Sequence, residues 1–255
     1  MTEKRLEHTP IHYWVNDAAA GSAIVFLHPA FANHTCFDAQ LEFFHDHRVI
    51  TMDLLGHGKS LGKGTIADTA GHIRQIMAAE NLDTINLVGV SIGAVFAQDF
   101  ANQYPAMVSS LSCIGGYDIN HFDPALQKDN TSHQMKSMRK AMFSIKAFAE
   151  DNKKISAHTK AAQDKFYQMN LEFKRSSFRY LSSLGRLVNR HPTPKRDYPL
   201  FIGVGEYDND LAKQASLQWH ESEPESIYLE FPNAGHIVNL DTPEAFNRAI
   251  KNVIR

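Results

Sequence analysis

A serine between two glycines is the first candidate for chemistry. Ser91 lies between Gly89 and Gly93, after an apolar run (84–90) that predicts a strand and before a segment (94–102) with helical spacing. The two glycines allow strand and helix to approach closely, because neither has a Cβ atom. Such a turn raises the hydroxyl above the sheet, with the positive end of the helix dipole beneath it. The pattern predicts a nucleophile; the alternative is an ordinary strand–glycine–helix junction.

An acid and a histidine follow two late strand-like runs. Asp208 comes shortly after the run 198–204, and His236 follows the run 227–231 in a Gly-His dipeptide. Serine, then acid, then histidine is the chain order of one known catalytic triad. Two other acids stay open as alternatives for the second member, namely Asp118 after an earlier strand and Asp210 two residues beyond Asp208.

These candidates need strands and helices in alternation to position them. Continuous apolar runs or β-type patterns predict strands at 11–15, 23–27, 48–52, 84–90, 108–114, 198–204 and 227–231. Helical spacing predicts helices at 34–45, 65–80, 94–102, 211–220 and 243–254, with Thr65 as an N-cap. Strands that alternate with helices of this length predict an α/β fold, a mostly parallel sheet with helices on both faces.

The pattern changes between 117 and 196. No strand-like run occurs there, and methionines and aromatic residues recur at helical spacing until Pro192 and Pro194. We therefore predict a core in two parts, 1–116 and 197–255, interrupted by a helical lid at 117–196. The apolar residues of the lid could line an apolar substrate pocket, but a stripe at helical spacing more often packs against the main domain.

The predicted lid is basic, whereas the rest of the chain is acidic. Residues 121–196 hold 16 Lys and Arg against 6 Asp and Glu, and the remainder holds 10 against 22. The charge could steer an anionic substrate, but such residues usually form the solvated face of amphipathic helices.

The composition is that of an ordinary globular protein. The chain has 255 residues, 43% hydrophobic and 21% charged, and a net charge of −2, which argues against nucleic acid as a partner. Cys36 and Cys113 lie among apolar neighbours, so we expect buried thiols. No segment resembles a signal peptide or a membrane span, so we expect a cytoplasmic protein without a membrane partner. We also expect no cofactor and no metal. The oligomeric state stays open, a dimer included.

Five motifs occur in the order of a known family. They are His28-Pro29, Asp53-x-x-Gly-His-Gly-x-Ser60, Gly-Val-Ser91-Ile-Gly, Gly205-x-x-Asp208 and Gly-His236. The chain thus resembles the α/β-hydrolase superfamily, and in particular its lid-bearing esterases, enol-lactonases and carbon–carbon bond hydrolases. The resemblance covers nearly the whole chain outside the predicted lid and implies the α/β-hydrolase fold.

The resemblance also implies roles. Ser91 would be the nucleophile, His236 the general base and Asp208 the acid that orients it. A serine hydroxyl needs a base near neutral pH, and a histidine with its ordinary pKa can take and return a proton there. The oxyanion hole would consist of the amides of Ile92 and Ala30, with Phe31 as the alternative to Ala30. Where the family has glycine this chain has Pro29, which has no N–H to offer.

Asp53 and His57 are interpreted as structural. They lie in a turn after a strand, where the Asp53 carboxylate can accept hydrogen bonds from the amides of the Gly-His-Gly sequence. This turn chemistry explains both residues without catalysis.

The function implied is hydrolysis of a small to medium carboxylic ester, lactone or thioester with an apolar acyl or aromatic group. Whether the substrate is also anionic stays open. Alternatives are carbon–carbon bond (meta-cleavage-type) hydrolysis, a cofactor-free haloperoxidase side activity, and a hydrolase-like small-molecule receptor with little turnover. Serine at position 91 excludes the haloalkane dehalogenases, which have aspartate there, and Ile92 argues against proline-specific peptidases, which usually have tryptophan.

Overall fold

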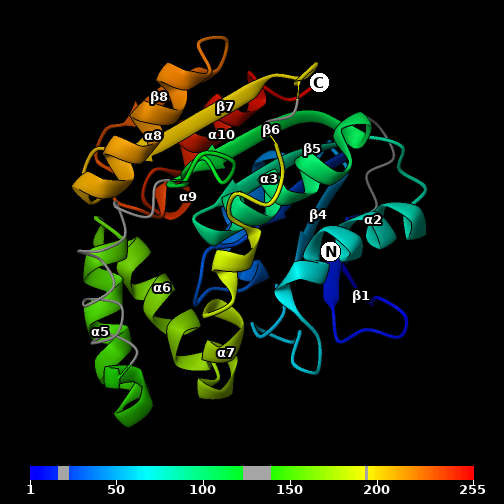
Figure 1. Cartoon of the computed structure of the whole chain (residues 1–255). Coiled ribbons are helices and arrows are strands. Elements are labelled where there is room, and N and C mark those ends of the chain that lie inside the picture. The colour runs from blue at the N-terminus through cyan, green and yellow to red at the C-terminus, as the bar shows by residue number, and fades with distance from the viewer. Residues whose placement is uncertain (17–22, 123–138, 193–194) are drawn as a thin grey trace.

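The centre of the protein is an eight-stranded sheet. The computed structural model describes residues 1–16, 23–122, 139–192 and 195–255. The strands follow the spatial order β1-β2-β4-β3-β5-β6-β7-β8 (Figure 1). Their bounds are Thr2–Arg5 (β1), His12–Val15 (β2), Ala23–Leu27 (β3), Val49–Met52 (β4), Ile85–Val90 (β5), Val108–Ile114 (β6), Leu200–Gly205 (β7) and Ile227–Phe231 (β8).

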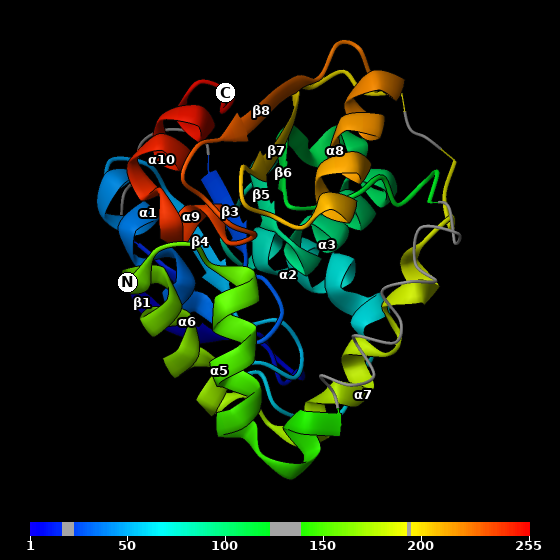
Figure 2. The same ribbon diagram turned by 90° about the vertical axis from the view of Figure 1, so that its left-hand side faces the viewer.

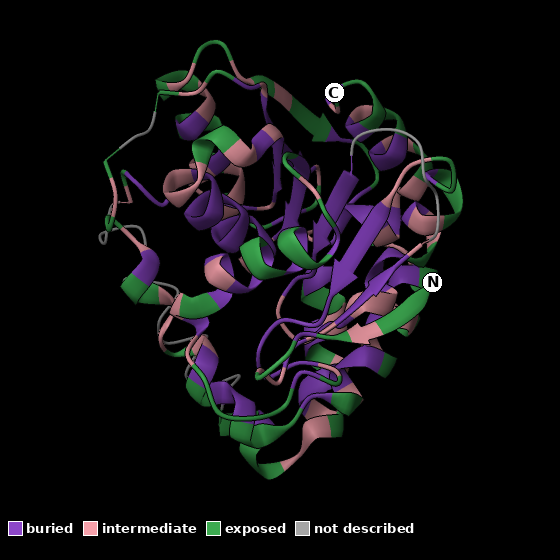
Figure 3. Ribbon diagram, turned by 90° about the vertical axis from the view of Figure 1, so that its right-hand side faces the viewer, coloured by how far each residue is buried: buried purple, intermediate pink, exposed green. Residues whose placement is uncertain are grey.

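The sheet is mostly parallel. β2 pairs antiparallel with β1 and with β4, and the pairings from β4 through to β8 are parallel. The seven predicted strands are confirmed within about two residues at their ends, but the expectation that 11–15 is the first strand was wrong, because β1 precedes it. β1 (Thr-Glu-Lys-Arg) is mostly exposed at the sheet edge, so it has none of the apolar pattern that reveals a buried strand (Figure 3).

Helices cover both faces of the sheet (Figures 1 and 2). One face packs against α2 (Thr69–Ala79), α3 (Ile92–Gln103) and α8 (Asp210–Ser222), with side chains such as Ile76, Phe96 and Trp219 in the shared core. The other face packs against α1 (Asp38–Phe43), α9 (Val238–Asp241) and α10 (Pro243–Lys251), which contribute Val238 and Phe246. The predicted α/β-hydrolase architecture is confirmed in these layers.

Local capping explains how two of the helices begin. The predicted N-cap Thr65 accepts from the Ala67 amide, and Asp68 completes a capping box, but the first turn is a 3₁₀ helix (Ile66–Asp68) before α2. The predicted helix 34–45 likewise divides into a 3₁₀ turn (His34–Phe37) and α1.

Both cysteines are free and buried, as predicted.

A helical segment, residues 139–187, lies at one end of the sheet (Figure 2). It contains α5 (Ile145–Ser156), α6 (Lys160–Glu172), α7 (Phe178–Leu181) and 3₁₀ turns at Arg175–Ser177 and Leu184–Leu187. It falls within the predicted insertion, whose Met135 and Met138 lie outside the described residues. Among the residues described, none of the helices is both long enough and apolar enough to span a membrane.

Candidate active site

Ser91 occupies a strained turn between β5 and α3. Its φ of 56° and ψ of −119° are unusual for a residue with a side chain, and such strain often marks a functional position. The glycines on either side make the turn possible. A Cβ at Gly89 would lie 2.3 Å from the Gly93 carbonyl oxygen, and a Cβ at Gly93 would lie 2.1 Å from the Leu27 carbonyl oxygen. The sequence-based expectation for this turn therefore has a steric basis.

His236 and Asp208 are joined by a hydrogen bond. Nδ1 of His236 lies 2.8 Å from Oδ2 of Asp208, whose carboxylate is fully buried. Oδ1 of the same carboxylate accepts from the backbone N–H of Asn209 at 2.8 Å and from its side-chain amide at 2.9 Å. Both carboxylate oxygens are thus satisfied, and His236 is held with Nδ1 as the donor and Nε2 as the group left for chemistry.

The charge beside His236 controls its pKa. Burial of the ring disfavours the imidazolium and lowers the pKa, but the charge of Asp208 and its hydrogen bond raise it, and the net effect is a pKa above the ordinary 6.5. A base with a raised pKa binds a proton more strongly, and the resulting imidazolium is stabilised by the same carboxylate.

The two loops that hold this pair are fastened to each other. The Tyr207 amide donates to the Ala234 carbonyl at 2.8 Å, and the Asn233 amide donates to the Glu206 carboxylate at 2.9 Å. Their glycines touch, because a Cβ at Gly205 would lie 2.1 Å from the carbonyl oxygen of the residue before His236. The spacing between acid and base is therefore set by backbone contacts.

Asp241 and Asn209 were missed by sequence reasoning. The Asp241 carboxylate accepts from the amide of Gly235 at 2.9 Å and from the amides of His158 and Thr159 at 2.6–3.0 Å. It thereby ties the loop of His236 to the start of α6. The position of Asn209 between an acid and a predicted helix was a recognisable N-cap signal, and it does cap α8, whereas no sequence signal marks Asp241.

A cavity of about 500 Å³ joins the candidates. Ser91, Ile92 and His236 all line it, with Tyr117 and Asn209 beside them. The rest of its described lining is apolar side chains, glycines and one hydroxyl: Val95, Gly115, Gly116, Phe122, Leu181, Ser182, Leu184, Gly185, Leu211, Ala212 and Ala215. Within this lining there is no lysine, arginine, aspartate or glutamate. The volume suits a small-molecule ligand.

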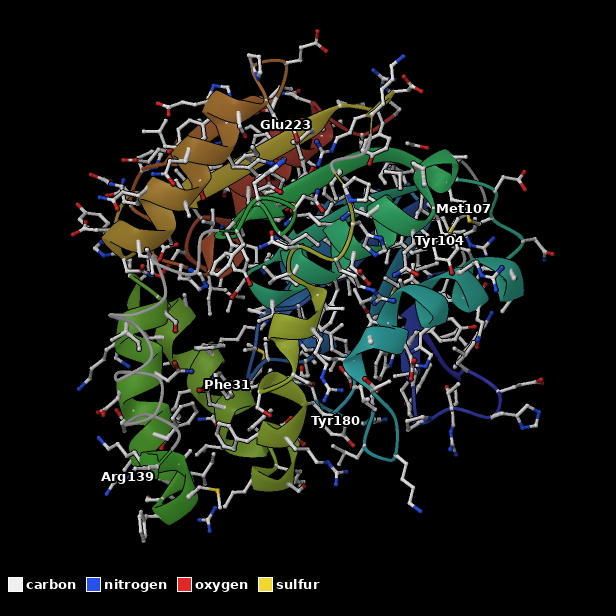
Figure 4. The ribbon with its side chains drawn as sticks, viewed as in Figure 1. Phe31, Tyr104, Met107, Arg139, Tyr180 and Glu223 are labelled. Atoms are coloured by element: carbon white, nitrogen blue, oxygen red, sulfur yellow. The ribbon has the colours of Figure 1, made fainter. Side chains whose placement is uncertain are left out.

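The candidate oxyanion amides come from two loops. The amides of Ile92, Ala30 and Phe31 have no acceptor among the described residues, but only Ile92 lines the cavity. Phe31 has a φ of 64°, and its side chain points into the helical segment (Figure 4). There its ring centroid lies 4.8–5.8 Å from those of Phe148, Phe173 and Phe178. These three aromatic side chains of the helical segment therefore pack against the loop after β3. None of the three is in the described lining of the cavity.

His28 stabilises the start of that loop. Its Nδ1 donates to the Pro29 carbonyl at 2.8 Å, and its Nε2 accepts from the Leu54 amide at 3.0 Å. This pattern requires the neutral ring, and burial lowers the pKa of His28 accordingly.

The alternative acids lie elsewhere. Asp118 bonds to His121 at 2.7 Å and to the Asn120 amide, while Asp210 is exposed at the start of α8. Asp53 is buried as expected for a structural residue, but the predicted partners were wrong. Its carboxylate accepts from the amides of His34 and Lys59, because the turn closes back toward the loop after β3.

His57 is buried against that loop. Its ring centroid lies 5.1 Å from that of His28 and 5.0 Å from that of Phe173. Burial lowers the pKa of His57 to about 3, so the ring is neutral near pH 7.

Comparison with known proteins identifies the family. Residues 24–249 match the alpha/beta hydrolase family. The chain belongs to this family. A curated relative from Acinetobacter baylyi, (E)-2-((N-methylformamido)methylene)succinate hydrolase, is 20% identical over 94% of the chain and 92% of its own length.

Solved structures of this family share the fold. The esterase EaEST from Exiguobacterium antarcticum aligns with a TM-score of 0.80 at 21% identity, over 95% of both chains. The enol-lactonase from Burkholderia xenovorans aligns with the same TM-score at 16% identity, over 99% of both chains. At these identities the likeness establishes the architecture of this alpha/beta hydrolase but not its substrate. The substrate has to be inferred from the lining of its own cavity.

Proposed function

We propose that the protein is a serine hydrolase that cleaves small to medium carboxylic esters, lactones or thioesters. Ser91 is the nucleophile, His236 the general base and Asp208 the acid that orients it. The observation that carries the proposal is the hydrogen bond between the buried Asp208 carboxylate and His236, which lines the same cavity as Ser91. A serine hydroxyl is a weak nucleophile near neutral pH, so it requires such a base.

The reaction proceeds in two displacement steps. The Oγ of Ser91 attacks the carbonyl carbon while its proton passes to Nε2 of His236. The tetrahedral intermediate then expels the alcohol, which takes that proton, and an acyl-enzyme remains on Ser91. A water molecule gives a proton to His236 and attacks the acyl carbon. His236 then returns that proton to the Oγ of Ser91 as the carbon–oxygen bond breaks, which releases the acid and restores the free serine.

The negative oxygen of each tetrahedral intermediate needs hydrogen-bond donors. The Ile92 amide stands at the start of α3, where the helix dipole also favours negative charge. The Ala30 amide is the second donor, with the Phe31 amide as the alternative, since both N–H groups lie in the loop after β3 and have no acceptor among the described residues. Each such donor contributes about 10²–10³ to the rate in comparable enzymes.

The cavity favours an uncharged substrate. Its described lining contains no lysine or arginine to pair with a carboxylate, and burying a charge without such a partner is costly. The relative from Acinetobacter baylyi is named for a succinate derivative, which carries carboxylates. The lining here supports neutral esters with an apolar acyl or aromatic group instead.

The test combines a covalent probe with a substrate panel. A serine-directed fluorophosphonate should label the protein, and p-nitrophenyl esters of graded chain length should be hydrolysed. Ser91→Ala should abolish labelling and lower kcat/KM by roughly 10⁴–10⁶, because no other group replaces the nucleophile. Ser182→Ala is the matched control, since this residue lines the same cavity. Unchanged labelling of Ser91→Ala would overturn the assignment, and labelling without turnover would instead favour a receptor.

A further inference from the structure

A second cavity, of about 400 Å³, lies between the core and the helical segment. On the core side it is lined by Lys63, Gly64 and Thr65, which precede α2. On the other side it is lined by four residues from α7 and the turns that follow it: Arg179, Tyr180, Ser183 and Arg186. We refer to it as the basic cavity. Its volume falls in the range of small-molecule sites.

The charges of the basic cavity have one sign. Lys63, Arg179 and Arg186 contribute three cations, and within the described residues none of them forms an ion pair with a carboxylate. Asp68 is the nearest acid in sequence, but its carboxylate accepts from the Thr65 amide and does not line the cavity. Three like charges facing one hollow repel each other, and an anion with several oxygens relieves that repulsion.

One wall is held in place before any ligand binds. Tyr180 is buried, and its hydroxyl donates to the Gly62 carbonyl, so α7 is fastened to the core loop (Figure 4). Its ring packs on Gly56, where a Cβ would lie 2.4 Å from Cδ2. Arg179 lies over the Tyr180 ring at 4.7 Å and donates to its hydroxyl at 2.7 Å. This guanidinium is therefore oriented in advance, which lowers the entropic cost of binding.

The basic cavity and the catalytic cavity share a wall. Within residues 179–186, Leu181, Ser182, Leu184 and Gly185 line the catalytic cavity. The four residues between and beside them line the basic cavity. A ligand that orders one side of this short stretch must act on the other side as well.

We propose that the basic cavity binds a small anion with a phosphate group, and that its binding orders the wall of the catalytic cavity. Guanidinium groups match phosphate oxygens in geometry, while lysine and hydroxyl side chains add donors. The site spans core and helical segment, so a bound phosphate connects the two. This proposal does not depend on the proposed ester hydrolysis.

Binding is measured by calorimetry with inorganic pyrophosphate and, separately, AMP. The double variant Lys63→Gln/Arg186→Gln should weaken both by about tenfold for each cation removed, and added salt should weaken the wild type. The matched control is Lys146→Gln/Lys154→Gln, which removes two exposed cations from α5. Binding by both anions means that the phosphate group is recognised, whereas binding by AMP alone assigns the site to phosphate esters.

Coupling is measured by hydrogen exchange, which needs no activity. Whichever of the two anions binds should slow exchange across 179–186 in the wild type and in the control, but not in the Lys63/Arg186 variant. Three results would overturn the proposal: no binding of either anion at millimolar concentration, equal weakening in the control, or binding without protection of 179–186. If the protein proves inactive on esters, these measurements still decide whether the basic cavity binds phosphate and orders residues 179–186.

Discussion

The loops at the strand ends and the helical segment contribute different things to the same cavity. The loops supply Ser91, Ile92 and His236, each fixed by backbone contacts or by a buried partner. From the helical segment come Leu181, Ser182, Leu184 and Gly185, none of which is charged. In the proposed function the chemistry belongs to the strand ends, and the helical segment sets the size and polarity of what can bind.

The two regions also differ in how their residues are held. Acid and base loops are joined by hydrogen bonds and by glycine contacts that leave no room for a side chain. The helical segment instead rests on aromatic packing around Phe31 and on Tyr180. Packing of this kind tolerates substitution better than buried polar contacts do. Variants of the first region should lower turnover of every ester, and variants of the second should change preference among esters.

Loss of the acid should have the largest effect in the comparison. Asp208→Asn keeps the shape but allows the wrong tautomer of His236, so kcat should fall by up to about 10⁴ for short and long esters alike. Steady-state kinetics on the p-nitrophenyl panel measures this. Asp210→Asn, at the exposed acid nearby, should retain near-full activity, as should Asp118→Asn. If only Asp210→Asn or only Asp118→Asn lost activity, that residue and not Asp208 would be the acid of the triad.

The same variant has a pH signature. In the proposed mechanism His236 acts as a base in its neutral form, and its pKa is above 6.5, so activity should rise with pH through an apparent pKa above that value. Asp208→Asn removes the charge that raises the pKa and leaves burial, which lowers it. The residual activity of the variant should therefore rise at a lower pH than that of the wild type. A profile of kcat/KM from pH 5 to 9 tests the direction.

Asp241→Asn should have the next largest effect. One amide oxygen cannot accept from three backbone N–H groups, and a buried unpaired donor costs about 1–3 kcal/mol. We expect the melting temperature to fall by several degrees and kcat by roughly 10–100-fold, because the loop of His236 shifts. Glu244→Gln, at a highly exposed carboxylate in α10, is the control and should change neither quantity. A drop in stability with full activity would show that Asp241 does not position His236.

The helical segment should respond differently. Leu184→Ala enlarges the cavity on the side of the helical segment, so long-chain esters should gain roughly tenfold over acetate in kcat/KM. Leu217→Ala, at an exposed leucine of α8 that does not line the cavity, should leave the ratio unchanged. An equal fall for all chain lengths would mean that the segment contributes to the chemistry, against the comparison drawn above.

Much of the fold could be predicted from the sequence because local patterns determine it. Buried parallel strands are continuous apolar runs, and β3 and β5 are buried along their whole length. The edge strand β1 was missed because a solvent-exposed edge needs no apolar residues. The partners of Asp53 were mispredicted because two of its donors, the amide and ring of His34, come from a loop nineteen residues away. Such contacts depend on topology, which no local pattern encodes.

The candidate site shows the same division. Ser91, Asp208 and His236 follow strands in short motifs, so their neighbourhood could be expected from chain order. Asp241 could not be found this way, because its three donors lie on two segments that meet only in the fold. The side chains that line the cavity from residues 181–185 were also beyond reach, since a helical stripe does not reveal which face meets the core.

The smallest expected effect concerns charge. The sequence leaves open whether the basic residues of 121–196 steer an anionic substrate, but the described lining of the catalytic cavity contains none of them. We therefore expect kcat/KM for an anionic ester and a neutral ester of matched size to change alike, within about twofold, between low salt and 0.5 M NaCl. Exposed charges act over about 10 Å at 0.1 M salt, so steering would appear as a selective loss for the anionic ester. Such a loss in the wild type that disappears in Lys63→Gln/Arg186→Gln would assign the steering to the basic cavity. That result would contradict the comparison drawn above, in which the helical segment selects the substrate through uncharged residues and the strand ends supply the chemistry.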